Sequence, residues 1–374
     1  MNTSQRVAAG VAGAIAALAL AACSAEPTPA GSGIEPTGEM AELISAAQAE
    51  GELTFYGDAN ETTLQQWTQA FTQEYGIAVN ILRLPGSELN QRFLQEQSAG
   101  QHQADIFAIA DRVSIETAVE QGMIAEYTPE HGDQYPEDQK MEGYFYPVQN
   151  GYFQTIAYNP TLLSEDEIAR IQADPVAAAG DPAFSGRVGV NMPQSSQQIA
   201  AFYYRLAEGD YADEYGWEAL EAIASNDPLF YSSATLVQNL IAGEYSIGFG
   251  ITDSLAFSFA MQGAPIEFVY PESTVGGYFA TSVVETAPHP NAARLFMEWA
   301  TTPEANALYT EITQTIPANT EVEDSREILD VAWYSQPDVS DVWFDFIRDE
   351  AFLEASSADG DFLPRWNQVF GYSG

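Results

Sequence analysis

The sequence has little of what builds disulfide-bonded domains or binds nucleic acid. It contains one cysteine, Cys23, in 374 residues, which excludes an intramolecular disulfide and a cysteine-based metal site. Basic residues number 12 against 54 acidic ones, for a net charge of −42. Because nucleic acids are bound through a basic surface, no DNA or RNA partner is expected. An acidic membrane surface would also repel so acidic a protein.

The acidic residues are spread along the whole chain, and Lys140 is the only lysine. A dispersed acidic surface that is poor in lysine indicates adaptation to high salt, where screening shortens the repulsion between charges. The alternative is a trap for cations, which would gather the charge in one run. We predict that thermal stability rises between low and molar salt, because screening relieves this repulsion. Thermal unfolding across that range checks the prediction, and equal stability throughout would contradict it.

The single cysteine stands at the end of an export signal. Residues 7–20 form an apolar run after the positive charge of Arg6, and Ala21-Ala22 precede Cys23. A charged head, an apolar core and small residues before a cleavage point are typical of such signals. The segment resembles the lipobox of bacterial lipoproteins, which implies lipidation of Cys23. A plain secretory signal and a membrane anchor are the alternatives, although the run is short for a bilayer span.

Apolar periodicity predicts an α/β fold with two lobes. Helical spacing is clear at 61–75, where Leu64, Trp67 and Phe71 share one face. In the first lobe we expect strands at 53–56, 77–82 and 105–109, and helices at 39–49, 61–75, 86–99 and 113–121. Strands that alternate with helices of this length indicate βαβ units and a parallel sheet covered on both faces.

Two extended segments, 145–148 and 153–159, should carry the chain into a second lobe, with Asn150-Gly151 between them. That lobe is expected to hold strands at 188–191, 229–231 and 246–250, and helices at 195–206, 214–224, 234–242 and 254–261. Residues 266–270 should then return the chain to the first lobe, which is completed by 283–284, a helix at 291–300 and a helix-rich tail. The predicted division is a signal at 1–22, a tether at 23–37, lobe 1 at 38–149 and 266–374, and lobe 2 at 150–265.

Four turns between a strand and the next helix carry short polar side chains. Ligands of open α/β sheets bind beyond the carboxyl ends of the strands, where helix N-termini offer unpaired N–H groups. Two turns come from each lobe, so they should converge on an interlobe cleft. The candidate ligand-binding residues are Tyr56, Asp58, Asn60, Gly86, Ser87, Asp111, Ser195, Ser196, Thr252, Asp253 and Tyr270. The alternative is that the polar residues only cap helices and the tyrosines are core residues.

An ordered series of short segments carries a family resemblance. The chain contains EGELTFY at 50–56, YGIAV at 75–79, GQHQADIF at 100–107, PAFSGRVG at 182–189, GEYSIG at 243–248 and FLPRWNQVFG at 362–371. This series resembles the extracellular solute-binding proteins of ABC importers, in the branch of ferric-ion and 2-aminoethylphosphonate binding proteins. The resemblance covers nearly all of 45–372. It implies a type II periplasmic-binding-protein fold, with two α/β lobes, a two-strand hinge and closure on a ligand.

The ferric members of that branch hold iron with a histidine, a glutamate and two adjacent tyrosines. In an ungapped comparison these positions fall at Asn60, Ala110, Thr252 and Asp253. Ferric iron prefers anionic or phenolate oxygens, so an iron site of that kind is not expected. A different iron site, built from Asp111, Asp253 and nearby tyrosines, is the alternative.

The resemblance implies a monomeric substrate-binding lipoprotein on the outer face of the cytoplasmic membrane, held there by a lipid at Cys23. It would capture a small polar solute by hinge closure and deliver it to an ABC permease, without a cofactor or a metal. We expect a phosphorylated, phosphonate or zwitterionic solute. Backbone N–H groups and Ser87, Ser195 and Ser196 could hold its acidic group, and Asp58 or Asp253 could pair with an ammonium group.

An extracytoplasmic enzyme and a ligand-sensing lipoprotein are the alternatives from other classes. The sequence has no GxSxG, HExxH or P-loop motif, and its histidines, His102, His131 and His289, stand in unrelated segments. Acidic pairs are uninformative in so acidic a chain. A binding protein is therefore favoured over an enzyme. Turnover of a bound metabolite would indicate an enzyme, and neighbouring genes for a permease and an ATPase would separate an importer from a sensor.

Overall fold

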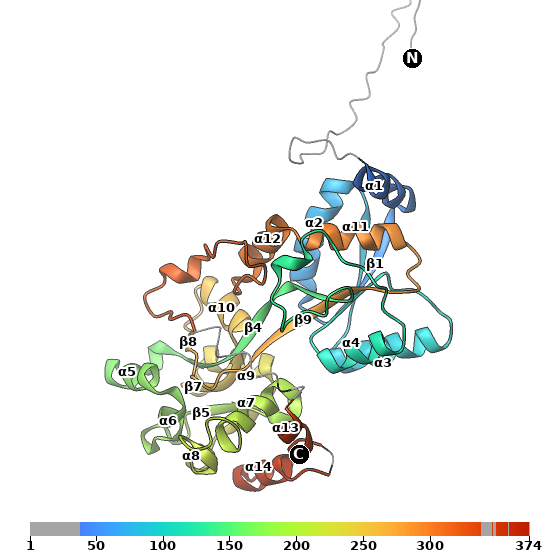
Figure 1. Ribbon diagram of the computed structural model, residues 1–374. Helices are drawn as coiled ribbons and strands as arrows, with labels where there is room; N and C mark the ends of the chain where they lie inside the picture. The colour runs from blue at the N-terminus through green and yellow to red at the C-terminus, as the bar shows by residue number, and fades with distance from the viewer. Residues whose placement is uncertain (1–37, 338–345, 347–348, 358, 374) are drawn as a thin grey trace, which may run out of the picture.

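The computed structural model describes residues 38–337, 346, 349–357 and 359–373. The predicted signal, the tether and Cys23 lie outside these residues. Two lobes follow one another in the long direction of the molecule, with strands crossing between them (Figure 1). Within the described residues, no helix has both the length and the apolarity that a membrane crossing requires.

The first lobe begins with elements that lie close to their predicted positions. They are α1 (Glu39–Glu50), β1 (Glu52–Gly57), α2 (Glu61–Tyr75), β2 (Ala78–Arg83), α3 (Gly86–Ser98), β3 (Ile106–Ile109) and α4 (Arg112–Glu120). β1 is parallel to β2 and to β3, as predicted. Asn60 caps α2 by accepting a hydrogen bond from the Thr63 N–H, and Gly76 ends the helix with a φ of 74° that favours glycine.

β4 (Tyr146–Tyr158) and β9 (Gly276–Val283) are the two hinge strands that connect the lobes. They pair antiparallel with each other, β9 also pairs with β3, and β4 continues into a ladder with β7. β4 is one strand without the predicted break at Asn150-Gly151. The irregularity there appears instead as two shifts of register against β9. Across the whole path the strand order is β2-β1-β3-β9-β4-β7-β5-β6.

The second lobe contains the predicted strands and helices and some that were not predicted. Its strands are β5 (Val188–Asn191), β6 (Leu229–Tyr231), β7 (Ile247–Thr252) and β8 (Glu267–Val269), and its helices are α5 (Glu165–Ala173), α6 (Pro175–Gly180), α7 (Gln197–Ala207), α8 (Gly216–Ala224), α9 (Ser233–Ala242) and α10 (Asp253–Met261). The unpredicted helices α5 and α6 have strong start signals. Ser164 and Glu167 form a capping box for α5, and Asp174 caps α6 just before Pro175.

The predicted return of the chain at 266–270 is wrong. These residues form β8, which pairs with β4 within the second lobe. Phe268 of β8 belongs to an apolar cluster with Ile251 and Phe257 of that lobe. The return to the first lobe comes later, through β9.

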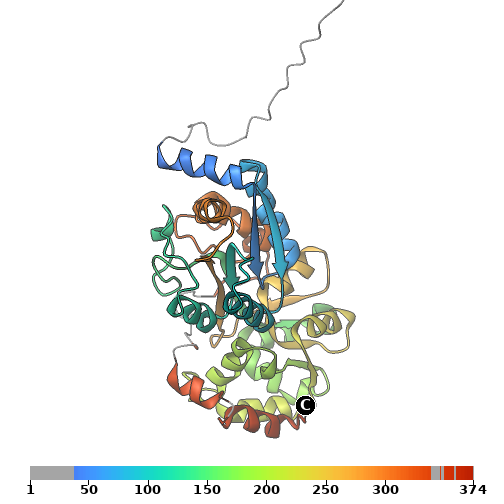
Figure 2. The ribbon, with the colours of Figure 1, turned by 90° about the vertical axis from the view of Figure 1, so that its right-hand side faces the viewer.

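The C-terminal helices divide between the lobes. α11 (Pro290–Ala300) and α12 (Pro303–Thr313) pack in the first lobe, whereas α13 (Glu350–Ala355) and α14 (Phe362–Phe370) pack on the second. The assignment of all of 266–374 to the first lobe is therefore wrong for its last part. The reason is the apolar face of α14, where Trp366 and Phe370 contact Tyr203 of α7. In Figure 2, α13 and α14 lie at the far end of the second lobe.

Each lobe has an aromatic core of its own. In the first lobe, Trp67 of α2 contacts Phe296 and Trp299 of α11 and Tyr309 of α12. In the second lobe, Tyr203 contacts Phe249 of β7 and Trp366 of α14. Fully buried aromatic side chains supply much of the hydrophobic stabilisation of a core. Each lobe can therefore hold its shape while the hinge strands bend.

Candidate ligand-binding cleft

A cleft of about 870 Å³ lies between the lobes, beside the hinge strands. The first lobe contributes the start of α2, the end of β2 and the end of α12. The second lobe contributes α10, and the hinge contributes Tyr152 and Phe279. Much of the polar lining consists of hydroxyl and amide side chains from both sides: Asn60, Thr62, Thr63, Gln66, Thr252, Ser254, Ser258 and Gln262. Such groups donate and accept hydrogen bonds and suit a polar organic ligand.

Arg83 is the one basic residue among the described residues that line this cleft. It ends β2, and its exposed side chain turns back over the loop between β1 and α2. Nε donates to the carbonyl oxygen of Ala59, and Nη2 donates to that of Asp58, both at 3.2 Å. These hydrogen bonds hold the guanidinium at the N-terminal end of α2. An arginine fixed in this way offers further N–H groups to an anion.

Asp58 joins the ends of three elements of the first lobe. Both of its carboxylate oxygens lie 3.2 Å from the backbone N of Ala110, which follows β3. A Cβ on Gly86, at the start of α3, would lie 2.9 Å from Asp58 Oδ2, so this position favours glycine. Burial raises the pKa of Asp58 to about 7, and repulsion from Asp111 adds to the rise, whereas the Ala110 N–H and Arg83 oppose it. This carboxyl group therefore titrates near neutral pH.

Asp253 occupies the equivalent place at the start of α10, but it is buried, with 3% of its surface exposed. Its Oδ1 accepts hydrogen bonds from the N–H groups of Phe153 and Ser254, and its Oδ2 accepts one from the Tyr270 hydroxyl. Burial raises the pKa of Asp253 to about 6, although these hydrogen bonds and Arg326 lower it. The side chain ties α10 to β4, so its predicted contact with a ligand is replaced by contacts within the protein.

We expect the replacement of Asp253 by asparagine to remove part of the pH dependence of stability. The folded-state pKa of about 6 lies above the unfolded value of about 3.9. The carboxyl group therefore stabilises the fold below about pH 4 and loses that contribution as the pH rises through 6. Asparagine keeps an oxygen for Phe153 and Ser254 and stays neutral. Urea unfolding from pH 4 to 8 measures this, and a pH-independent difference between the two proteins would contradict the expectation.

Some of the predicted site residues come together at the cleft. Asn60 and Thr252 line it. Asp58 lies beside it, with Gly86 against its carboxylate. Asp111 caps α4 and is close enough to raise the pKa of Asp58.

Two predicted tyrosines are engaged within the protein. Tyr56 is 1% exposed, and its hydroxyl donates to Glu96 at 2.8 Å. Burial raises the pKa of Tyr56 to about 12, and the hydrogen bond to Glu96 adds to the rise. Tyr270 donates its hydroxyl to Asp253 at 3.1 Å. Tyr56 is therefore a core residue, which was the alternative considered for the tyrosines. Tyr270 holds the carboxylate of Asp253.

The predicted serines do not line the cleft within the described residues. Ser87 is exposed on the first turn of α3. Ser195 donates its hydroxyl to Asn191 Oδ1 at 2.9 Å, and Ser196 caps α7 by accepting from the Ile199 N–H. The capping interpretation thus accounts for Ser196 in this structure.

Sequence reasoning missed Arg83, Tyr152 and Phe279. Two features of the sequence could have identified Arg83 as a candidate site residue. It is the only basic residue between 40 and 91, and it stands at the end of a strand. Tyr152 and Phe279 gave no such signal. Their place in the cleft depends on the pairing of β4 with β9, which brings together residues far apart in the chain.

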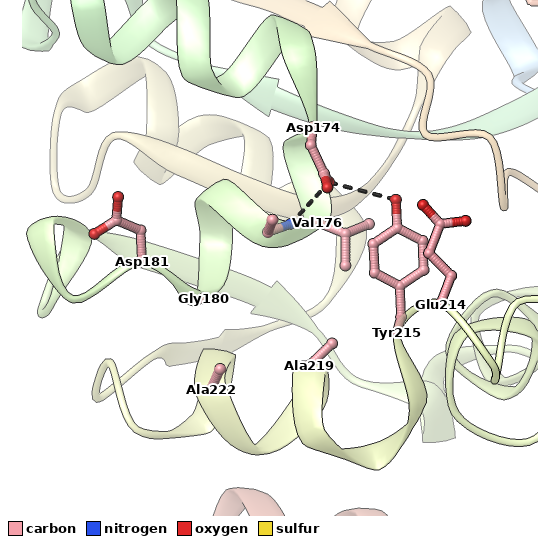
Figure 3. Close-up of a pocket in the computed structure, with 9 residues that line it drawn as sticks. Asp174, Val176, Gly180, Asp181, Glu214, Tyr215, Ala219 and Ala222 are labelled. Atoms are coloured by element: carbon pink, nitrogen blue, oxygen red, sulfur yellow. Dashed lines mark hydrogen bonds between the residues drawn. The ribbon is translucent and has the colours of Figure 1, made fainter.

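A second hollow lies within the second lobe, and Figure 3 shows its lining. Its volume is about 380 Å³, and α6 and α8 form much of its wall. Asp174 Oδ1 accepts hydrogen bonds from the Ala177 N–H at 2.9 Å and from the Tyr215 hydroxyl at 3.4 Å. All of its lining residues belong to one lobe. A ligand there could not bridge the lobes, so the interlobe cleft is the candidate site.

No metal-binding group is present among the described residues: nowhere do three or more His, Cys, Asp or Glu side chains gather as a metal would require. The positions compared with iron ligands have other roles. Asn60 caps α2, Ala110 donates its N–H to Asp58, Thr252 lines the cleft, and Asp253 is buried. The cleft lining also includes the carboxylates of Glu311 and Glu327, beside its hydroxyl and amide groups.

Known proteins resemble this chain in sequence and in fold. The sequence profile of the bacterial extracellular solute-binding protein family matches residues 66–336. The Fe(3+)-binding periplasmic protein of Serratia marcescens is 21% identical over 272 residues, which are 68% of this chain and 75% of that protein. The resemblance predicted from the ordered segments is therefore confirmed.

Solved structures show the same fold. Iron-bound HitA of Pseudomonas aeruginosa aligns with a TM-score of 0.62 at 17% identity, over 78% of this chain and 95% of that one. AfuA of Actinobacillus pleuropneumoniae, solved with fructose-6-phosphate bound, aligns with a TM-score of 0.61 at 19% identity, over 87% of this chain and 100% of that one. The predicted type II periplasmic-binding-protein fold is confirmed.

Proposed function

We propose that this chain, which belongs to the family of bacterial extracellular solute-binding proteins, captures a small polar organic anion in its interlobe cleft. Proteins of this family bind small solutes and deliver them to the membrane permease of an ABC importer. The single observation that supports an anion is Arg83, held at the N-terminal end of α2 by the carbonyl groups of Asp58 and Ala59. Arginine and a helix N-terminus both favour negative charge.

The lining of the cleft supports an organic solute over a bare ion. On the first-lobe side, the cleft is lined by Gln66 of α2 and by Asn60, the residue just before α2. On the second-lobe side, it is lined by Thr252 and Ser254 at the start of α10. Hydroxyl and amide groups suit phosphate, phosphonate or carboxylate oxygens and the hydroxyl groups of a metabolite. Asp58 beside the cleft would pair with an ammonium group in its ionised form, which extends the proposal to zwitterionic solutes.

Capture follows from the division of these groups between two lobes. A solute that contacts α2 and α10 together stabilises the closed state, because both sets of contacts are complete only when the lobes approach. β4 and β9 are the strands that would bend, since they are the connections that carry the sheet from one lobe to the other. The closed form would then be the one that docks on the permease.

Calorimetry and small-angle scattering on the purified exported protein test this proposal. We expect at least one phosphorylated, phosphonate or zwitterionic metabolite of a panel to bind, and the same solute to reduce the radius of gyration. Ferric ion is a separate arm of the titration, because the Serratia marcescens relative is an Fe(3+)-binding protein. If ferric ion binds tightly and no organic solute binds, the proposal of an organic anion as ligand is refuted. If no ligand reduces the radius of gyration, the proposal that the lobes close on the ligand is refuted.

The proposed location is the outer face of the cytoplasmic membrane, with a lipid on Cys23 and residues 24–37 as the tether. The support is the sequence alone, since an export signal precedes this one cysteine. We expect Cys23→Ser to move the protein from the membrane fraction to the soluble fraction in its native host. Unchanged fractionation of this variant would refute lipidation.

A further inference from the structure

We propose that Tyr152 and Phe279 form an aromatic wall that selects solutes carrying a ring. The inference rests on the proposed function, since it concerns the ligand of the same cleft. Both residues line that cleft, and they stand on different hinge strands, β4 and β9. The ligand class is therefore a cyclic organic anion, whose ring packs on the wall while Arg83 holds its acidic group.

The two rings form one continuous surface. Their centroids lie 5.3 Å apart and their planes meet at 41°. Gly277, which is paired with Tyr152 across the ladder, makes this arrangement possible. A Cβ on Gly277 would lie 3.0 Å from Nε2 of Gln198, 3.0 Å from Cζ of Tyr152 and 3.1 Å from the Tyr152 hydroxyl, so a larger residue would crowd both side chains. The absence of a side chain at Gly277 thus leaves room for the Tyr152 ring.

Both rings differ from an ordinary core aromatic in that they remain partly exposed. Tyr309 lines the same cleft, but it is 3% exposed and its ring packs against Trp67. Tyr309 therefore offers little free surface, whereas Tyr152 and Phe279 present aromatic surface on the hinge side. A partly exposed aromatic pair in a polar cleft is positioned for stacking with a ligand.

The cleft around the wall contains one basic side chain, Arg83, and two acidic ones, Glu311 and Glu327, among its described lining residues. Arg83 supplies the charge-assisted hydrogen bonds for an acidic group. Thr252 and Ser254 supply hydroxyl groups from the second lobe. Two kinds of solute share this chemistry: a sugar phosphate, whose ring has an apolar face, and an aromatic phosphate. Packing of a ring on an aromatic surface should improve binding about tenfold over an acyclic anion of the same charge.

Calorimetry with three phosphate monoesters tests the inference: fructose 6-phosphate, phenyl phosphate and glycerol 3-phosphate. We expect at least one cyclic ester to bind about tenfold tighter than glycerol 3-phosphate. Phe279→Leu keeps an apolar side chain and should abolish that preference, so that the cyclic esters bind no tighter than glycerol 3-phosphate. Tyr152→Phe keeps the ring and should retain the preference. Tyr372→Leu, which removes a half-buried ring at the C-terminal end of the second lobe, is the matched control for folding.

The two cyclic probes distinguish the kinds of ring. Tighter binding of fructose 6-phosphate would identify a sugar ring, and tighter binding of phenyl phosphate would identify an aromatic ring. Equal affinity for all three esters would overturn the inference, as would a Phe279→Leu variant that weakens them equally. Binding of none of the three would also overturn it. In each of these cases the proposed function is judged separately, by whether any metabolite of the wider panel compacts the protein.

Discussion

Replacing Arg83 with methionine is expected to weaken the binding of an anionic solute by about 100-fold. A hydrogen bond to a charged group contributes about 1.5–3 kcal/mol, and each 1.4 kcal/mol changes affinity about tenfold. Arg83 is the one basic residue lining the cleft among the described residues, so no described neighbour there can replace its charge. Methionine keeps much of the length and the apolar stem of the side chain. The measurement is calorimetry with the tightest-binding anion of the metabolite panel.

Two further variants make this expectation specific. Arg83→Lys keeps the charge but loses the planar fork, so it should recover only part of the affinity. Arg92→Gln is the matched control, because Arg92 is exposed on α3, pairs with Glu96 and does not line the cleft. Unchanged affinity in Arg83→Met would show that the anion is bound elsewhere. Equal losses in the Arg83 and Arg92 variants would point to a general effect of charge on so acidic a protein.

Replacing Trp366 with alanine is expected to lower the free energy of unfolding by about 3–5 kcal/mol. Trp366 of α14 is fully buried, stacks on Phe370 with ring centroids 4.3 Å apart and contacts Tyr203 at 5.5 Å. Its truncation would leave a cavity between the C-terminal helix and α7. Urea unfolding, followed by tryptophan fluorescence and circular dichroism, measures the loss.

The indole nitrogen of Trp366 provides the control. Within the described residues, Nε1 of Trp366 has no hydrogen-bond partner, whereas Nε1 of Trp67 donates to the carbonyl oxygen of Ala305 at 2.9 Å. Trp366→Phe should therefore cost less than Trp67→Phe, which also removes a buried hydrogen bond. If Trp366→Ala unfolds at the same urea concentration as the natural protein, α14 is not a structural part of the second lobe.

Many helices and strands could be predicted from the sequence, because neighbouring residues determine where such elements begin and end. The helix at 61–75 was predicted at its observed bounds, since Asn60 caps it, Gly76 ends it and its apolar residues repeat at helical spacing. The strands at 188–191 and 229–231 were predicted at theirs too. Short apolar runs bounded by turns define such strands whatever surrounds them.

Tertiary placement was less accessible. Periodicity shows that α14 has an apolar face but not which lobe that face covers, and the second lobe provides Tyr203 as its partner. The same limit applies to β8, whose pairing with β4 is a contact between distant residues. Two cleft residues, Asn60 and Thr252, were predicted from the sequence. They stand in polar turns before helices, and the residue types that cap helices are also those that contact polar ligands. Tyr152 and Phe279 were not predicted, because the sequence does not distinguish a partly exposed aromatic residue from a core one.

The ends of the folded body belong to different lobes. α1 lies at the outer end of the first lobe and α14 at the outer end of the second (Figure 1). A hinge-bending rotation that brings the outer ends of the two lobes toward each other therefore shortens the separation between Glu39 and Phe370. A donor fluorophore attached before Glu39 and an acceptor attached after Phe370 would convert ligand capture into an optical signal. The chain is thus suited to a single-molecule sensor that leaves both lobes and the hinge uninterrupted.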